Sequence, residues 1–161
     1  MDDAEYFRAP DRATAKALHG KSYALFETAA RHGCEALAPG LVDIGDPFGA
    51  VNKLVGLLSG PSYEEIVFSG IPTAHIPPPE EVAASSSGLL VELSEVVRDT
   101  LADASDQALA EAAPLWVMIE EFTYRTDHAD EMLNTARELA ALARRARDAG
   151  QMLYASISLG R

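Results

Sequence analysis

The chain has 161 residues, of which 48% are apolar and 24% are charged, and this size and composition predict one globular domain over residues 1–161. Its formal net charge of −12 excludes nucleic acid and anionic membranes as partners, because the surface repels phosphate groups. The single cysteine, Cys34, excludes an intrachain disulfide. We expect a cytoplasmic protein, since the acidic start has no secretory signal and no apolar run approaches the roughly 20 residues of a membrane helix.

The first 60 residues predict one strand and three helices. Residues 6–9 favour a first strand, and Asp11 then caps a helix over residues 12–19. A second helix is expected over residues 22–32. A third is expected over residues 46–60, because it begins with a capping acid followed by proline, which is typical of a helix N-terminus.

Residues 59–88 form the least regular part of the chain, with five prolines and a run of three serines. We expect an irregular Pro/Ser-rich loop here, with a short strand over residues 66–68 and mobility near residues 83–87. A domain boundary within this loop is the alternative. It is disfavoured, because each half alone approaches the lower size limit for a stable core.

The next stretch predicts a strand over residues 89–93 and two helices. Ser94 and Ser105 are each placed to cap a helix by accepting from a free amide. Pro114 lies inside the second of these helices and is expected to kink or restart it, since proline has no amide proton.

The last third of the chain predicts a helix that leads directly into a strand. Apolar residues recur at helical spacing over residues 129–146, and Thr126 or Asp127 is placed to cap the helix. Gly150 ends it, and the alternation over residues 151–159 predicts a strand with one buried face. The expected buried face consists of Leu153, Ala155, Ile157 and Leu159.

Together these elements predict an α+β fold, a small and mostly antiparallel sheet covered by five to six helices in a single domain. The strands of this sheet are the N-terminal one, the short strand of the Pro/Ser-rich loop, and those over residues 89–93 and 151–159.

The chain has no motif for phosphate binding, dinucleotide binding or serine hydrolysis. Its four histidines do not show zinc-ligand spacing with one another or with Cys34, so we expect no metal and no other cofactor. His19 and His32 precede glycines at expected helix ends, where we interpret them as caps. Cys34 is interpreted as a small buried side chain.

Three arginines near the end of the last helix, Arg144, Arg145 and Arg147, form the main cluster of positive charge. We interpret them as compensation of the helix dipole, together with pairing to Glu138 and Asp148. This interpretation leaves no basic surface for nucleic acid.

Glu120 and Glu121 lie beside Trp116 in the most apolar part of the chain. A carboxylate at the edge of an apolar core can have a raised pKa and act as a general acid or base, whereas pairing with an arginine is the structural alternative. The functional reading predicts a small-molecule pocket with aromatic walls. Its candidate residues are Tyr6, Arg8, Trp116, Glu120, Glu121 and Tyr154.

Several stretches carry a resemblance: residues 6–11 (YFRAPD), 98–103 (RDTLAD), 119–122 (IEEF) and 139–154 (LAALARRARDAGQMLY). They are similar to a group of small uncharacterised actinobacterial proteins. More distantly, the helix–glycine–strand ending resembles the YfbM-like family of unknown function. The resemblance implies an α+β domain whose last helix leads into a final strand, and it implies no catalytic residue.

The sequence favours a non-catalytic acidic accessory protein, of a regulatory or immunity type, that binds another protein. The absence of a catalytic motif, the charge of −12 and the long loop all point this way. The alternative is a small-molecule-binding domain or minor enzyme with its pocket near Trp116, Glu120 and Glu121. A purely structural or oligomer-forming role is the third possibility, and the sequence leaves the oligomeric state open.

Overall fold

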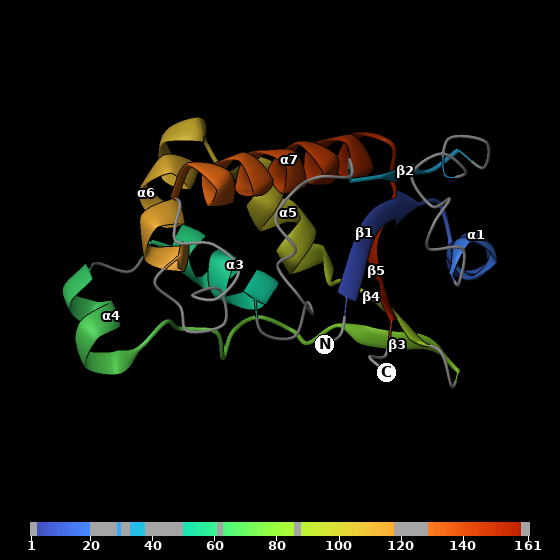
Figure 1. Cartoon of the computed structure of the whole chain (residues 1–161), viewed down its shortest axis with the longest axis horizontal. Helices are drawn as coiled ribbons and strands as arrows, with labels where there is room; N and C mark the ends of the chain where they lie inside the picture. Colours follow the sequence, from blue (N-terminus) through green and yellow to red (C-terminus); the bar gives the residue numbers. More distant parts are fainter. Residues whose placement is uncertain are drawn as a thin grey trace.

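Five strands form one sheet in the computed structural model, which describes residues 3–19, 29, 33–37, 50–60, 63–85, 88–117 and 129–158 (Figure 1). Their order across the sheet is β2 (Glu35–Ala36), β1 (Asp3–Ala9), β5 (Met152–Ser158), β4 (Gly88–Glu92) and β3 (Glu80–Ser85). Every neighbouring pair is antiparallel. The central strand β5 places Tyr154 opposite Phe7 of β1 and Ser156 opposite Leu90 of β4.

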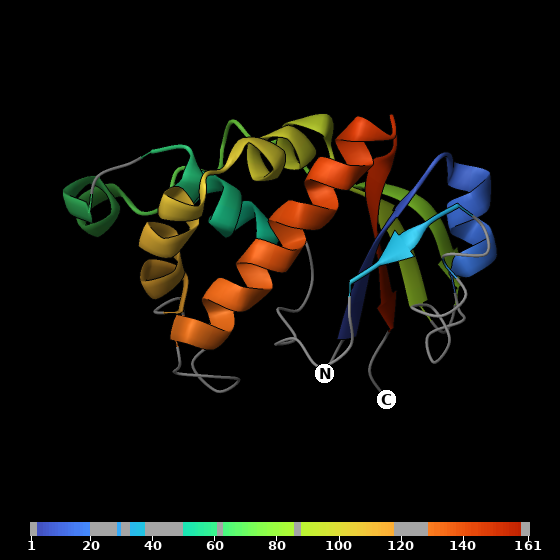
Figure 2. The ribbon, with the colours of Figure 1, turned by 90° about the horizontal axis from the view of Figure 1, so that it is seen from above.

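Six helices accompany the sheet in the described part of the chain: α1 (Arg12–Leu18), α3 (Asn52–Leu58), α4 (Tyr63–Ser69), α5 (Glu95–Asp103), α6 (Asp106–Val117) and α7 (Ala129–Asp148). The long helix α7 packs against α5 and α6, and α3 packs against α6. Figure 2 shows α3, α5, α6 and α7 on one side of the sheet and α1 on the other. The α+β fold and the antiparallel sheet predicted from the sequence are confirmed.

Both faces of the sheet are covered, and the expectation of a single buried face on the last strand is therefore wrong. One face carries Leu153 and Ala155 into the large core beneath α7. The other face carries Tyr154 into a smaller core with residues of α1. Tyr154 is only 1% exposed and Ser156 only 9%. The reason is topological, since β5 is the central strand and α1 shields the side that alternation assigned to solvent.

Four helix ends lie where the sequence predicts them. The predicted caps are confirmed, because amides donate to the side chains of Asp11, Ser94 and Ser105 over 2.7, 3.3 and 3.0 Å. Helix α6 continues through Pro114. Gly150 adopts a φ of 67°, a conformation that few other residues tolerate, and it separates α7 from β5 as expected.

The region expected to be an irregular loop, residues 59–88, is more regular than predicted. The expected strand over residues 66–68 is wrong, because this segment belongs to α4, where Glu64 and Glu65 favour the first turn. Residues 80–85 form β3, which pairs with β4 and has a register shift between Glu81 and Ala83. Residues 83–85, part of the stretch expected to be mobile, pair with β4.

Several predictions lie outside the described residues. These are most of the helix over residues 22–32, the start of the third helix at Asp46, the caps Thr126 and Asp127, and the end of the last strand at Leu159.

Candidate functional site

The structure separates the residues that the sequence proposed as one pocket. Tyr6 and Trp116 are buried in the large core, and the Trp116 indole nitrogen donates to the carbonyl of Ala50 over 3.0 Å. Tyr154 lies in the smaller core on the opposite face of the sheet. Glu120 and Glu121 lie outside the described residues, so their part in a pocket stays a prediction.

Arg8 belongs to a polar network that joins strands β1 and β2 to the end of α7. Its Nε donates to Glu35 Oε1 over 2.9 Å, and Arg145 donates to the same oxygen over 2.7 Å. Arg8 also donates to the side chain of Gln151, which in turn donates to the carbonyl of Gly33. Burial disfavours the charged form of Glu35, but the two guanidinium groups outweigh it and hold its pKa below the ordinary value. This network holds β2 in place.

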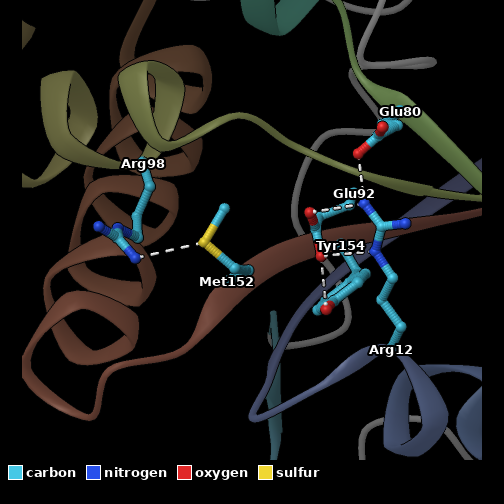
Figure 3. A network of polar contacts seen from close by, with 6 residues as sticks. All are labelled: Arg12, Glu80, Glu92, Arg98, Met152 and Tyr154. Carbon is cyan, nitrogen blue, oxygen red and sulfur yellow. Dashed lines mark hydrogen bonds and ion pairs between the residues drawn. The ribbon is translucent and has the colours of Figure 1, made fainter.

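A second network ties α1 to the sheet (Figure 3). Arg12 forms ion pairs with Glu92, over 3.2 Å, and with Glu80. The Tyr154 hydroxyl donates to Glu92 over 2.8 Å, and burial together with this bond raises the pKa of Tyr154. The donors and acceptors in this network satisfy one another, so we interpret it as structural.

Figure 3 also shows Arg98 of α5 reaching Met152 at the start of β5. The same guanidinium donates to the carbonyl of Gln151 over 3.1 Å and pairs with Asp99. Arg98 therefore fixes α5 to the turn between α7 and β5.

The smaller sequence predictions have mixed outcomes. Cys34 is buried, as expected, and burial raises the pKa of its thiol. His19 ends α1 through its backbone amide, while its ring contacts Ser156 Oγ over 2.8 Å. His32 lies outside the described residues.

The arginine cluster near the end of α7 finds partners on other elements. Arg144 donates to the carbonyls of Ala102 and Ala104 at the end of α5. Arg145 pairs with Glu35, and Arg147 pairs with Asp103. The ion pairs expected with Glu138 and Asp148 are thus replaced by long-range ones, since α7 packs closely against α5.

The most exposed apolar side chains of the described residues lie on α4. Phe68 is 87% exposed and Val67 is 59% exposed. Both views place α4 at the end of the molecule far from the sheet, standing apart from α3 and α6 (Figures 1 and 2). Glu64 and Glu65 precede Phe68 by four and three residues, so they share its side of the helix. The tip therefore combines an aromatic ring with two carboxylates.

The segment that follows α4 anchors it to the body of the protein. Ile66 packs against the large core, and Ile76 is buried within it. Ile71 and the carbonyl of Pro72 approach Gly56 of α3 so closely that a Cβ there would lie 2.7 and 2.9 Å from them. The helix is thus held by Ile66 and by the segment that follows it, while its tip stays in solvent. We call residues 59–60 and 63–79 the arm.

A groove runs along the base of the arm, between the end of α3 and the helices α5 and α6. It has two adjoining hollows that share Leu58 and Ala108. The smaller hollow, of about 280 Å³, has Leu57, Ala112 and Leu115 in its walls, together with Glu111. The polar hollow, of about 620 Å³, presents Ser59, His75, Thr100, Asp103 and Ser105. We call the two together the basal groove.

Residues 54–97, which include the arm, carry negative charge without any lysine or arginine. Between Lys53 and Arg98 there are six glutamates and no lysine, arginine or aspartate, so this stretch carries half of the net charge of −12. Two of these glutamates, Glu80 and Glu92, pair with Arg12 on the far side of the sheet. The arm itself has only acidic charge at neutral pH.

Comparison of the chain with protein-family models, with curated proteins and with solved structures finds no match. Within the described residues, histidine, cysteine and acidic side chains do not gather in groups of three or more that could hold a metal ion. No helix of that part of the chain is long and apolar enough to span a membrane.

The arm and its groove were missed by reasoning from the sequence. No local sequence pattern predicts that Phe68 is exposed, because the apolar residues 66–68 between two acids and a glycine are equally typical of a short buried strand. One feature of residues 59–79 could have indicated an exposed surface: two acidic residues precede an aromatic residue, and the stretch has no lysine or arginine.

Proposed function

We propose that this chain is a non-catalytic, acidic accessory protein of a regulatory or immunity type, and that α4 is its main contact with another protein. The single observation that carries the proposal is the 87% exposure of Phe68 on a helix held by buried anchors. Aromatic residues, phenylalanine included, are enriched in protein–protein interfaces relative to the rest of the surface.

The exposed tip offers a useful amount of binding free energy. Burying a fully exposed Val or Phe side chain gains roughly 1.5–3 kcal/mol. Scaled by their exposed fractions of 59% and 87%, Val67 and Phe68 together offer roughly 2–4 kcal/mol to a protein that covers them. This amount is worth a factor of roughly 30 to 1,000 in affinity.

Photocrosslinking in an extract of the source cells tests the proposal. The variant Phe68→p-benzoylphenylalanine is expected to give a discrete crosslinked protein, which excess wild-type protein suppresses and excess Phe68→Ser does not. The matched control is Val96→p-benzoylphenylalanine on α5, since Val96 is 41% exposed and distant from the arm in the sequence. Equal crosslinking at the two positions, or none at position 68, would contradict the proposal.

A small-molecule-binding role is the second candidate, and the polar hollow favours it. This open hollow presents polar side chains of α5 and of the arm, and Ser59 Oγ lies 3.3 Å from His75 Nε2 in its wall. We place this candidate site at the basal groove rather than at Trp116, whose side chain is fully buried. A thermal-shift screen of metabolites tests it: a stabilising compound must lose its effect in Thr100→Val and Ser59→Ala.

The resemblance to the YfbM-like family also remains a proposal. The helix–glycine–strand ending that suggested it is present, with α7, Gly150 and β5 in direct succession, and this supports the proposal. A solved structure of a family member tests it, because kinship requires the same strand order and the same central position of the last strand.

A further inference from the structure

The arm ends in three consecutive prolines, residues 77–79, which lead into β3 along the lower edge of the molecule in Figure 1. Each ring fixes φ at about −65°, and each residue before a proline is confined to extended conformations, so the stretch from Ile76 to Pro79 is a short polyproline II helix. Such a helix has about three residues per turn, which places Ile76 and Pro79 on the same edge. Both are buried, whereas Pro77 and Pro78 are exposed. The protein therefore holds this helix along one edge and presents the other two to solvent.

The two exposed prolines keep groups that a partner can use. Their rings are apolar, and within the described part of the chain no hydrogen bond ends on the carbonyl of Pro77 or Pro78. Because the backbone is already extended and rigid, little conformational entropy is lost when a partner covers it. These are the properties by which polyproline II segments are recognised.

An open hollow adjoins the proline segment at the start of α5. Its lining is mainly apolar and consists of the three prolines together with Glu80, Glu92, Leu93 and Ser94. The polar side chains of this lining have partners inside the protein, because both glutamates pair with Arg12 and Ser94 caps α5 (Figure 3). What the hollow offers to a partner is therefore chiefly the proline rings.

Negative charge marks one end of the proline segment. Glu80 and Glu81 follow it directly, and both are exposed. Glu80 pairs with Arg12, whereas Glu81 forms no ion pair with another described residue. The residues before the segment, 71–76, include no acidic side chain. A groove with a basic side chain at one end would thus bind the segment in one direction only.

We propose that this segment docks in an aromatic-lined groove of a partner protein, at a contact separate from the tip of α4. Tryptophan or tyrosine rings of that groove pack on Pro77 and Pro78, and an indole N–H or a phenol O–H donates to one of their carbonyls. A lysine or arginine of the partner faces Glu81. A second copy of this chain is a poor occupant, because Phe68 is the only exposed aromatic residue among the side chains that the structure describes.

A small peptide with an aromatic face tests the proposal without the natural partner. The probe is a fluorescent β-hairpin of about 14 residues, closed by a disulfide because free hairpins are marginally stable. Two tryptophans lie side by side on one face, and two lysines lie at one end. Fluorescence anisotropy is expected to show binding with a dissociation constant below about 1 mM. A counterpart with leucine in place of both tryptophans is expected to bind at least about fivefold more weakly.

Variants of the segment separate docking on the prolines from binding elsewhere. Pro77→Ala with Pro78→Ala removes both exposed rings, keeps every carbonyl and is expected to weaken binding by about tenfold. The matched control is Pro72→Ala, an exposed proline that does not line the hollow, and it is expected to bind like the wild type. Circular dichroism of each variant confirms that the fold is kept.

The charge at the end of the segment is tested in the same way. Glu81→Gln is expected to weaken binding by about two- to threefold, as befits one exposed ion pair. Glu111→Gln, an exposed acid on α6 that does not line this hollow, is the control and is expected to have no effect. Amide chemical shifts of the protein should change at Glu80, Glu81 and Ser94 when the hairpin is added.

Four results would overturn the proposal: no binding at about 1 mM, equal binding of the leucine hairpin, equal weakening by Pro72→Ala, or shift changes confined to other elements. Each is distinguishable from failure of the proposed function, which crosslinking at position 68 tests. Crosslinking at position 68 in a protein that does not bind the hairpin keeps α4 as a contact and rejects only the proline site. Hairpin binding that depends on Pro77 and Pro78, without crosslinking at position 68, has the opposite meaning.

Discussion

Gly56, in the interior of α3, allows a decisive test of how the arm is anchored. By helix propensity alone, Gly56→Ala should stabilise the protein by about 1 kcal/mol, because alanine favours the helix. The structure predicts the opposite sign. A Cβ at this position would lie 2.7 Å from Ile71 Cγ2, 2.9 Å from the carbonyl oxygen of Pro72 and 3.4 Å from Thr73 Cγ2.

The magnitude follows from which of these atoms can move. The Ile71 side chain can adjust its rotamer, but the Pro72 oxygen belongs to the backbone and moves only if the base of the arm moves. Overpacking of this kind costs about 1–3 kcal/mol. After the gain of about 1 kcal/mol in propensity, we expect a net loss of about 1 kcal/mol and a Tm lower by roughly 2–4 °C.

Urea unfolding followed by circular dichroism measures the change in the free energy of unfolding. The variants Gly56→Ala and Ile71→Ala and their double variant form a double-mutant cycle. Removing Cγ2 relieves one of the two close contacts, so Gly56→Ala should cost less in the Ile71→Ala background, by about 0.5 kcal/mol or more. If Gly56→Ala raises the stability by about 1 kcal/mol, the close approach is not real and the reasoning on the anchored arm fails. A cycle with no coupling would reject the contact with Ile71.

Three further predictions concern the polar networks. Arg144→Met leaves two carbonyls at the end of α5 without their donor, so we expect a loss of about 1–3 kcal/mol in urea unfolding, far more than for the exposed Arg147→Met; similar losses would refute the capping role. The pKa of Glu35 is lower in the folded protein than in the unfolded chain, where it is about 4.3, so its ion pairs stabilise the fold fully above about pH 4.3. This stabilisation is lost as the pH falls through the folded-state pKa. In Glu35→Gln the free energy of unfolding should therefore depend less on pH in the acid range. Burial lowers the pKa of His19, so the neutral ring stabilises the fold fully above about pH 6.5, and the free energy of unfolding decreases as the pH falls below that. His19→Asn should remove this pH dependence. An unchanged pH dependence would exclude His19 as its source.

Much of the fold was predictable because local chemistry marks it. Asp11, Ser94 and Ser105 each cap a helix through a side-chain oxygen, and Gly150 ends α7 with a positive φ. These signals act within a few residues, so a single sequence is enough to read them. The sheet order and the second core could not be read in this way, because the position of β5 between β1 and β4 depends on pairing across more than 60 residues.

The candidate site was less predictable than the fold. Phe68 is exposed because nothing covers that side of α4 in the described structure, and exposure depends on the whole assembly of helices rather than on neighbours in sequence. Trp116 and Tyr154 were reasonable pocket candidates by residue type. Instead, Ala50 and Glu92 satisfy their polar atoms within two separate cores, and such partners are distant in the sequence.

The anchoring of the arm decides whether α4 can bind anything. Isolated helices shorter than about 12–15 residues are marginal in water, so the seven residues of α4 depend on the packing of Ile66 and of the segment that follows the helix. Ordering seven free residues at the moment of binding would cost roughly 7–14 kcal/mol, well above the roughly 2–4 kcal/mol that Val67 and Phe68 offer. A partner can therefore use the tip only if the protein has already ordered it. It follows that Gly56, although buried in α3, should affect binding as well as stability, because its missing Cβ is what lets Ile71 hold the base of the arm.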